Sequence, residues 1–416
     1  MGTVSRGLSE TVHRIAFQEI NAGQSSNQYQ SDPLLARLKE MGTELWMDTG
    51  DLELAQSIWK TELTALTTNN TLANQVVQSG VMDTVIQETV TKLEEAASGL
   101  SREELIMEIG FVINCRIALR LVQAFKVKVS VELHPSISRD IEKSVEYGRR
   151  YFDVCPEYFI IKVPLTPEGL LATRRIRQDN IPVNFTLGFS ARQNYLAARL
   201  ANPNYVNVFL GRLNAVVADN SAGNGDWVGE KVTLNTQDAL SEVRNKHADV
   251  KTRLIAASIR NGDQVATLAG MDIHTIPPGA MKEFQESGRT PDQIQKTDGV
   301  GLKPELKPEH DWSARVAGLW ELEGDFQNAV DQLMARSDLD QLSGEALEQF
   351  FSDKGLDLFH PFSRDDLKKI HDDGKIPKLG DWSNAIALDD LMTHSALQSF
   401  TKDQNALDAR IESFLK

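Results

Sequence analysis

Short apolar runs alternate with longer segments of helical spacing over most of the chain, and this alternation restricts the fold more than any other feature. The runs are rich in β-branched and aromatic residues, and they lie at residues 44–48, 64–69, 129–133, 159–164, 183–190, 206–211, 253–259 and 272–278. Between them, segment 101–125 has apolar residues at helical spacing behind a capping box of Ser101 and Glu104. Strands that alternate with helices favour a parallel sheet.

The number and spacing of the runs predict an α/β fold, a closed (β/α)8 barrel of the TIM type. Roughly eight strands over about 240 residues match the size of such a barrel. An open doubly wound sheet is the alternative, but no G-x-G-x-x-G motif opens the first helix. Helical patterns beyond the runs predict an additional C-terminal helical extension.

Composition shifts divide the chain into five segments. A polar stretch precedes the first run, and a segment rich in proline, glycine and charge follows the last one. Beyond that, Trp312, Val316 and Leu319 begin an apolar helical face. We expect a flexible or surface-draped segment at 1–39, the catalytic barrel at 40–288, a linker at 289–311, a helical insertion of unknown role at 312–390 and a closing helix at 391–416 that packs on the barrel.

The charge and the cysteines exclude several classes of partner. The net charge of -15 disfavours nucleic acid and anionic membranes. Cys115 and Cys155 have no C-x-x-C spacing, and none of the eight histidines has metal-site spacing, so we expect no metal and no cofactor. With no signal pattern at the amino terminus and no apolar run of about 20 residues, we expect a cytoplasmic protein.

Polar residues interrupt or follow the apolar runs at seven of the predicted strands. In a barrel these positions lie at or near the carboxyl ends of the strands, where active sites form. A single polar pocket inside an apolar wall is therefore predicted. Its members are Asp48, Asn69, Glu132, Lys162, Asn184, Thr186, Asn207, Arg212, Ser258 and Arg260.

Lys162 lies in the middle of the apolar run "FIIKVPLT". It either pairs with a carboxylate or is buried in order to be neutral, because burial without a permanent partner lowers the pKa of an amine and makes it nucleophilic. Asp48 and Glu132 could move protons to and from a substrate, or could instead cap the following helices. Asn69, Asn184, Thr186 and Asn207 can hold sugar hydroxyls without adding charge.

Two arginines and a serine follow the sixth and seventh runs. Arg212, Arg260 and Ser258 predict a clamp for a terminal phosphate, although the arginines could instead pair with acids at the barrel mouth. The glycine-rich stretch 223–230 is either a mobile cover of the site or a plain loop.

Several motifs in register carry a resemblance to one family. "LWMDTGDLE", "TTNNTLANQ", "VSVELHPSISRD", "FIIKVPLTPEGLLA", "NFTLGFSARQ", "VFLGR" and "AASIR" occur in the order and spacing of the transaldolases. The region from about 40 to 285 resembles this family throughout, and the last predicted helix is similar to the closing helix of the family.

The resemblance implies a role for each pocket residue. Lys162 would form the Schiff base, Asp48 would be the acid and base for the hydroxyl, and Glu132 and Thr186 would hold the catalytic water. Asn69 and Asn184 would bind a dihydroxyacetone unit, and Arg212, Ser258 and Arg260 would bind the phosphate. Phe209 matches a phenylalanine of the pocket wall, where a tyrosine would favour simple aldol cleavage.

This chain departs from the family pattern at three positions and in one region. Asn70 replaces a proline, His134 replaces an aspartate, and Asn207 stands where a serine usually contacts the donor substrate. The region from about 290 to 390 is longer than in compact members.

The resemblance implies a transaldolase of the non-oxidative pentose phosphate pathway. It would move a dihydroxyacetone unit between ketose phosphates and aldose phosphates. The alternatives are a Schiff-base aldolase that releases free dihydroxyacetone, a transferase with an altered acceptor, and a non-catalytic scaffold. The expected partners are small sugar phosphates, and a homodimer is left open.

Overall fold

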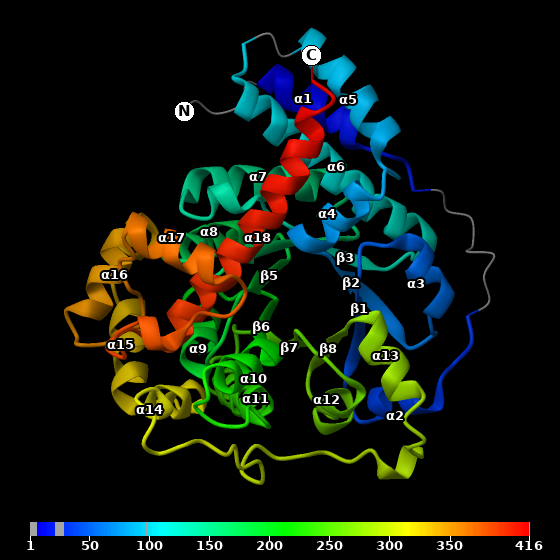
Figure 1. The fold of residues 1–416 in the computed structure, drawn as a ribbon. Coiled ribbons are helices and arrows are strands. Elements are labelled where there is room, and N and C mark those ends of the chain that lie inside the picture. Colours follow the sequence, from blue (N-terminus) through cyan, green and yellow to red (C-terminus); the bar gives the residue numbers. More distant parts are fainter. Residues whose placement is uncertain (1–5, 21–28, 97–98, 416) are drawn as a thin grey trace.

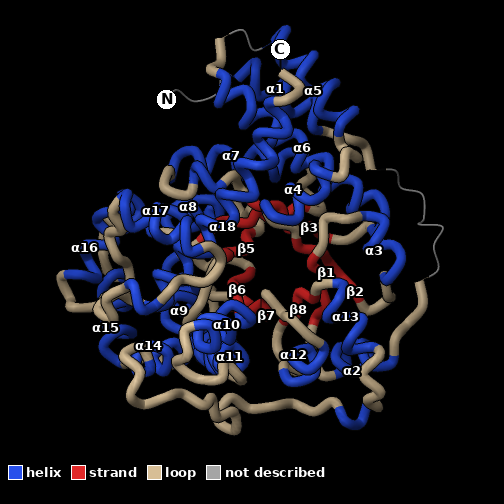
Figure 2. The backbone as a smooth tube through the Cα atoms, in the orientation of Figure 1, coloured by secondary structure: helices blue, strands red, loops and turns tan. Residues whose placement is uncertain are grey.

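A closed parallel barrel forms the centre of the computed structural model, which describes residues 6–20, 29–96 and 99–415. Within these residues eight strands pair in chain order, and β1 also pairs with β8. Figure 2 shows the strands as a central ring inside the helices. Their bounds are β1 Glu44–Asp48, β2 Leu63–Thr67, β3 Lys128–Glu132, β4 Phe159–Pro164, β5 Val183–Thr186, β6 Tyr205–Phe209, β7 Arg253–Ala257 and β8 Ile273–Ile276. The predicted (β/α)8 barrel is confirmed.

The register of the strands brings the polar residues of neighbouring strands to the same level. Lys162 of β4 lies opposite Glu132 of β3 and Asn184 of β5. Asp48 of β1 lies opposite Thr67 of β2. Because paired residues of neighbouring strands lie side by side, the register alone places these groups together at the end of the barrel.

Helices cover the outside of the barrel, and most begin soon after a strand ends. Their bounds are α3 Leu52–Ile58, α4 Asn70–Gln78, α5 Asp83–Ala96, α6 Arg102–Phe125, α7 Ile141–Val154, α8 Pro167–Gln178, α9 Ala191–Leu200, α10 Leu210–Asp219, α11 Val228–Lys246, α12 Gly262–Thr267 and α13 Pro278–Gln285. The capping box of Ser101 and Glu104 starts α6. Thr166, Ser190 and Asn261 cap α8, α9 and α12, which explains these sharp helix starts.

The segment before β1 contains two helices, which differs from the expectation of a flexible or draped stretch over 1–39. In α1, Arg6–Ala16, the residues Leu8, Val12 and Ala16 repeat every four positions and are buried. This helix packs against α5, α6 and α7. Helix α2, Pro33–Glu40, begins with the N-cap Asp32. The polar residues 21–28 lie outside the described residues.

A helical segment follows the barrel along one side of the molecule. Residues 289–311 run past α11 and α12 along the lower edge of the view in Figure 1, with one short turn, η2 Pro291–Gln293. Helices α14 Ser313–Ala317, α15 Gly324–Met334, α16 Gly344–Ser352 and α17 Arg364–Asp373 come next, with the turns η3 Gly318–Trp320, η4 Leu339–Gln341 and η5 Leu379–Asp381. Helix α15 packs on α9 and helix α16 packs on α8.

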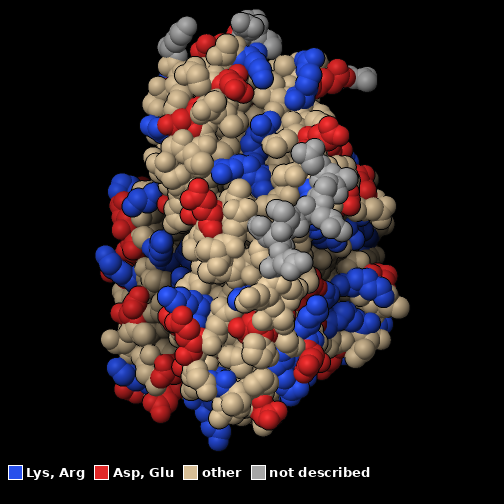
Figure 3. All heavy atoms as spheres, turned by 90° about the vertical axis from the view of Figure 1, so that its right-hand side faces the viewer, with Lys and Arg blue, Asp and Glu red and all other residues tan. Residues whose placement is uncertain are grey.

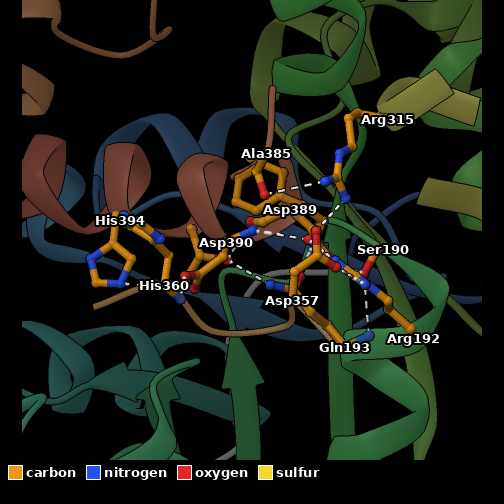
Figure 4. A network of polar contacts seen from close by, with 12 residues as sticks. Ser190, Arg192, Gln193, Arg315, Asp357, His360, Ala385, Asp389, Asp390 and His394 are labelled. Carbon is orange, nitrogen blue, oxygen red and sulfur yellow. Dashed lines mark hydrogen bonds and ion pairs between the residues drawn. The ribbon is translucent and has the colours of Figure 1, made fainter. Parts of the chain in front are cut away.

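A partly buried network of charges joins this segment to the barrel (Figure 4). Arg192 of α9 lies 2.7 Å from Asp389 and 3.1 Å from Asp357. Arg315 of α14 also pairs with Asp357, and the Ser190 hydroxyl donates to Asp389 over 2.6 Å. Asp389 is only 1% exposed, and its cationic partner Arg192 offsets the cost of burying its charge.

The final helix, α18 Leu388–Glu412, crosses the barrel mouth (Figure 1). It packs on α4, α6, α17 and the short turn η1, Pro135–Ile137. The Thr393 hydroxyl donates to the Leu187 carbonyl just after β5 over 2.9 Å. The helix therefore covers the end of the barrel at which the polar residues gather.

No helix in the described part of the chain is long and apolar enough to cross a membrane. Figure 3 shows acidic and basic side chains interspersed over one face of the molecule. That face therefore has no single large acidic patch.

Candidate active site

A cavity of about 710 Å³ opens at the carboxyl end of the barrel. Nine of the predicted site residues line it, namely Asp48, Asn69, Lys162, Asn184, Asn207, Phe209, Arg212, Ser258 and Arg260. Glu132 and Thr186 are not part of the lining and are buried. The predicted residues therefore meet at a single place, although six strands and the segments after them supply the nine that line the cavity.

Lys162 is buried beside a carboxylate. Its side chain is only 5% exposed, and Nζ lies 3.1 Å from Glu132 Oε2. Nζ also donates to the Thr68 carbonyl over 3.1 Å. The hypothesis of a lysine buried without a permanent partner is therefore wrong, because the register of β3 and β4 sets Glu132 directly beside it.

The pKa of Glu132 is raised above its ordinary value. Burial disfavours its charge, and the neighbouring Lys162 ammonium opposes this effect only in part. A carboxylate with a raised pKa accepts a proton more readily, so Glu132 is suited to take the proton that Lys162 must lose before attacking a carbonyl.

Asp48 lies at the end of β1 and is held by a chain of hydroxyl groups. The Thr67 hydroxyl donates to Asp48 Oδ1 over 2.6 Å, and the Thr275 hydroxyl lies 2.6 Å from that of Thr67. Burial raises the pKa of Asp48, against the lowering effects of Lys162, Thr67 and Arg260.

Neither Asp48 nor Glu132 caps a helix, so the capping alternative for these two residues is wrong. The helix after β1 is capped by Asp51, and the turn after β3 is capped by His134. Both site carboxylates therefore remain available for a role in binding or proton transfer.

Amide side chains form a relay beside Lys162. Asn184 Nδ2 donates to the Ser130 hydroxyl over 3.1 Å, and Asn207 Nδ2 donates to Asn184 Oδ1 over 2.9 Å. Asn207 Oδ1 accepts from the Leu187 backbone, where φ is 70°. Asn207 thus fixes Asn184 and a residue in the left-handed region, which is a strained conformation for leucine.

Asn69 and Thr186 are two further predicted polar residues of the site. Asn69 caps α4 through its Oδ1, which accepts from the Leu72 backbone over 2.9 Å, and its side chain lines the cavity. Thr186 Oγ1 is buried and has no hydrogen-bond partner among the described residues. A buried hydroxyl without a protein partner is suited to hold a water molecule.

Arg212 and Arg260 give the cavity two positively charged lining residues. Arg212 is only 6% exposed, and its pKa is lowered to about 10 by burial and by the nearby Arg260. Its Nη1 donates to the Lys375 carbonyl over 3.2 Å. Neither arginine forms an ion pair with a carboxylate of the described residues, although the charges of Asp403 and Asp48 partly oppose the lowering of the pKa of Arg212 and of Arg260 by burial.

Gly211 allows the two sides of this cationic pocket to approach. A Cβ at this position would lie 2.3 Å from the Ser258 carbonyl oxygen and 2.6 Å from Arg260 Cγ. Ser258 itself has a φ of 61°, in the left-handed region. The backbone is therefore shaped to bring Ser258 and Arg260 next to Arg212.

Sequence reasoning missed other residues of the cavity wall, and Phe400 and Lys375 are two of them. Phe400 of α18 lies 5.9 Å, ring centroid to Nζ, from Lys162 and 5.8 Å, centroid to Cζ, from Arg212. From the sequence, Phe400 is expected only within the closing helix at 391–416. Lys375, between α17 and η5, also lines the cavity, and no local pattern marks it.

The stretch 223–230 contributes no residue to the lining of the cavity in the described part of the chain. Gly223 forms a bridge with Leu306, and a Cβ at Gly229 would lie 2.1 Å from the Leu210 carbonyl oxygen. Residues 228–230 form the first turn of α11, so the plain-loop interpretation holds only for residues 223–227.

Two of the departures from the family pattern belong to one polar chain through α18. Asn70 Nδ2 donates to Gln404 Oε1 over 2.8 Å, and Gln404 Nε2 donates to Asp408 Oδ1 over 2.8 Å. Asp408 Oδ2 lies 3.1 Å from His134 Nε2. Asn70 and His134 thus hold the helix that covers the site.

Comparison with known proteins agrees with this geometry. The family described as Transaldolase/Fructose-6-phosphate aldolase matches residues 45–341, which include seven complete strands, most of β1 and every predicted site residue. The chain belongs to this family. The resemblance inferred from the motifs is confirmed, and members of the transaldolase/fructose-6-phosphate aldolase family are enzymes.

Individual relatives carry transaldolase names. A "Probable transaldolase" of Thermus thermophilus is 34% identical over 273 residues, which cover 65% of this chain and 97% of the relative. Another, of Exiguobacterium sibiricum, is 34% identical over 172 residues, 41% of this chain and 71% of the relative. A "Transaldolase" of Nostoc sp. is 26% identical over 287 residues, 65% of this chain and 82% of the relative.

Proposed function

We propose that this family member is a transaldolase that works through a Schiff base on Lys162. It would transfer a dihydroxyacetone unit from sedoheptulose 7-phosphate or fructose 6-phosphate to glyceraldehyde 3-phosphate or erythrose 4-phosphate, as in the non-oxidative pentose phosphate pathway. One observation carries the proposal: a buried lysine lies 3.1 Å from a carboxylate beside a cavity that also contains two arginines without carboxylate partners among the described residues.

The first step is attack of the Lys162 amine on the ketone carbon. Glu132 takes the ammonium proton, a C–N bond forms, and the ketone oxygen becomes the hydroxyl of a carbinolamine. That hydroxyl leaves as water after protonation, which gives the iminium. Glu132 returns the proton, and Thr186 holds the water, which its otherwise unpartnered hydroxyl supports.

The second step breaks the carbon–carbon bond. Asp48 takes the proton of the substrate hydroxyl, the aldose phosphate leaves as an aldehyde, and the electron pair of the bond moves to the iminium to give an enamine. The enamine then attacks an acceptor aldehyde, and the same steps run in reverse order to release the new ketose phosphate. Asn69 and Asn184 hold the three-carbon unit, and Arg212, Ser258 and Arg260 hold the phosphate.

A related aldolase that releases free dihydroxyacetone is the second candidate, because the family description includes fructose-6-phosphate aldolase. Phe209 lines the cavity where a tyrosine would favour that reaction, which supports transfer. Release of dihydroxyacetone without an acceptor, at a rate matching transfer, would favour this candidate.

We further propose a cytoplasmic enzyme. Cys115 and Cys155 are both free and buried, which fits a reducing compartment.

Borohydride trapping tests the mechanism. Fructose 6-phosphate and borohydride should leave a reduced three-carbon adduct on the peptide that contains Lys162, and Lys162→Met should abolish both adduct and transfer. An adduct on another lysine, or transfer by Lys162→Met at the wild-type rate, would overturn the assignment of Lys162. Absence of both adduct and transfer in the wild-type protein would leave the scaffold alternative.

A further inference from the structure

The loop 374–379 brings the helical segment to the cavity. Lys375 in this loop lines the same cavity as Arg212 and Arg260, although it lies more than 110 positions after Arg260 in the chain. The barrel strands thus do not supply the whole lining, and the helical segment has a place in the site.

Hydrogen bonds from α10 hold the backbone of this loop. Arg212 Nη1 donates to the Lys375 carbonyl over 3.2 Å. Asn220, just after α10, donates through Nδ2 to the Pro377 carbonyl over 3.0 Å and accepts at Oδ1 from the Leu379 backbone over 2.7 Å. The same helix that carries Arg212 therefore fixes the loop beside it.

The other side of the loop is held by the helical segment and by α18. The Ser395 hydroxyl of α18 donates to the Gly374 carbonyl over 3.2 Å, and Trp312 Nε1 donates to the Leu379 carbonyl over 3.1 Å. Gly374 has φ 87° and ψ -137°, a conformation that side chains disfavour. Ordering a loop costs conformational entropy, and these hydrogen bonds offset that cost. They therefore hold the Lys375 backbone in a fixed place.

The charge of Lys375 is not satisfied within the described protein. It forms no ion pair and no side-chain hydrogen bond there, whereas Lys378 of the same loop lies 3.6 Å from Asp373. Arg212 and Arg260 likewise have no carboxylate partner in the described residues. Asp48 also lines the cavity and its charge acts on Arg260, but no carboxylate of the described residues forms an ion pair with Arg212, Arg260 or Lys375. Three cations that border one cavity without an ion pair favour a doubly charged anion.

We propose that Lys375 is a third phosphate-binding residue, which the helical segment supplies to the barrel. This inference rests on the proposed function, because it assigns the anion as the phosphate of the sugar substrates. Lysine is a compact charge on a flexible stem, so it can follow phosphates of substrates that differ in length. The segment after the barrel thereby acts in selection of phosphorylated sugars.

Acceptor kinetics test the role of Lys375. In Lys375→Gln, the KM for glyceraldehyde 3-phosphate should rise about five- to tenfold, and the inhibition constant of inorganic phosphate should rise by a similar factor. The KM for unphosphorylated glyceraldehyde should change less than about twofold, and Lys375→Arg should recover most of the loss. Lys378→Gln is the matched control, since it removes one positive charge from the same loop without touching the cavity.

Wild-type KM and phosphate inhibition in Lys375→Gln would overturn the inference, as would an equal loss in Lys378→Gln. Direct titration with inorganic phosphate separates this failure from failure of the proposed function. If the wild-type enzyme transfers nothing and forms no Lys162 adduct, the proposed function fails. Weaker phosphate binding by Lys375→Gln alone would still support the binding role, and equal binding would refute it.

Discussion

Lys162 and Glu132 form a buried pair that can change its state without changing its net charge. Movement of one proton from the ammonium to the carboxylate converts the pair from ions to a neutral amine and a neutral acid. An apolar surrounding penalises separated charge, so it favours that exchange more than water would. The proposed attack by Lys162 depends on this proton transfer to Glu132.

Glu132→Gln tests whether the pair generates the nucleophile. Glutamine keeps the size of the side chain but cannot accept the lysine proton, so the rate of Schiff-base formation should fall about 10²- to 10⁴-fold. Rapid borohydride quenching after mixing with fructose 6-phosphate measures that rate.

Asp48→Asn provides the comparison for this prediction. It removes the base for bond cleavage and leaves the Lys162 pair intact, so an adduct should still form quickly but should retain all six carbons of fructose. If Asp48→Asn slowed adduct formation as much as Glu132→Gln, the division of roles between the two carboxylates would be wrong.

Residues on the strands could be predicted from the sequence, because a parallel register forces strand-end side chains to one level. Lys162, Asn184 and Asp48 follow this rule. The pairing of Glu132 with Lys162 needs the actual register, which the sequence did not supply. Phe400 and Lys375 belong to distant segments, and nothing in their local pattern says where those segments dock.

At the scale of the elements, α18 is held by residues that replace common family residues. Asn70 and His134 both connect to this helix, through Gln404 and Asp408. The two replacements are therefore coupled through one helix, and each is explained by the same polar chain.

His134→Asp tests that coupling. Aspartate can still cap the turn η1, but it would face Asp408, and two carboxylates in place of the present contact should lower the free energy of unfolding by about 1 kcal/mol. Urea unfolding measures the change. His134→Asn keeps the cap without the second negative charge, and Asp408→Asn should rescue His134→Asp. Simple additivity of the two changes would contradict the coupling.

The strands were predictable because buried β-branched runs are distinctive, and each predicted run overlaps the observed strand. The first helix was missed for a physical reason. Only three of its residues, Leu8, Val12 and Ala16, are buried apolar residues, and they become buried because α5, α6 and α7 pack against them. Tertiary contact decided this element more than local preference did.

For the whole molecule, the junction of barrel and helical segment contains buried titratable groups. Burial raises the pKa of Asp390 to about 8, although the His360 backbone donates to it over 2.7 Å. Burial also lowers the pKa of His394 to about 3, and its Nε2 lies 3.8 Å from Asp390. Both groups therefore favour their neutral forms in the folded protein.

Asp390 and His394 change the free energy of unfolding in opposite directions as the pH rises. Asp390 has a raised pKa, so its contribution is complete below its ordinary value of 3.8 and is lost as the pH rises to about 8. His394 has a lowered pKa, so its contribution is complete above 6.5 and is lost as the pH falls toward 3. Of these two groups, only Asp390 changes the free energy of unfolding as the pH rises from 6.5 to about 8.

Asp390→Asn should therefore gain stability relative to the wild type as the pH rises from about 6.5 to about 8. The difference should change by at most about 1.4 kcal/mol per pH unit. Thermal unfolding of both proteins at matched pH measures it. Asp365→Asn, which alters an exposed acid of α17, should show no such trend, and a constant difference between Asp390→Asn and the wild type would refute the assignment.

The order of synthesis gives the covering helix a further consequence. A ribosome makes all eight strands before it makes α18, and domains generally fold as they emerge. A nascent chain can thus hold Lys162 and Glu132 in a formed barrel while Phe400 and the loop that carries Lys375 have not yet been translated. The complete cavity then forms only late in translation, when α18 and the loop 374–379 dock beside Lys162.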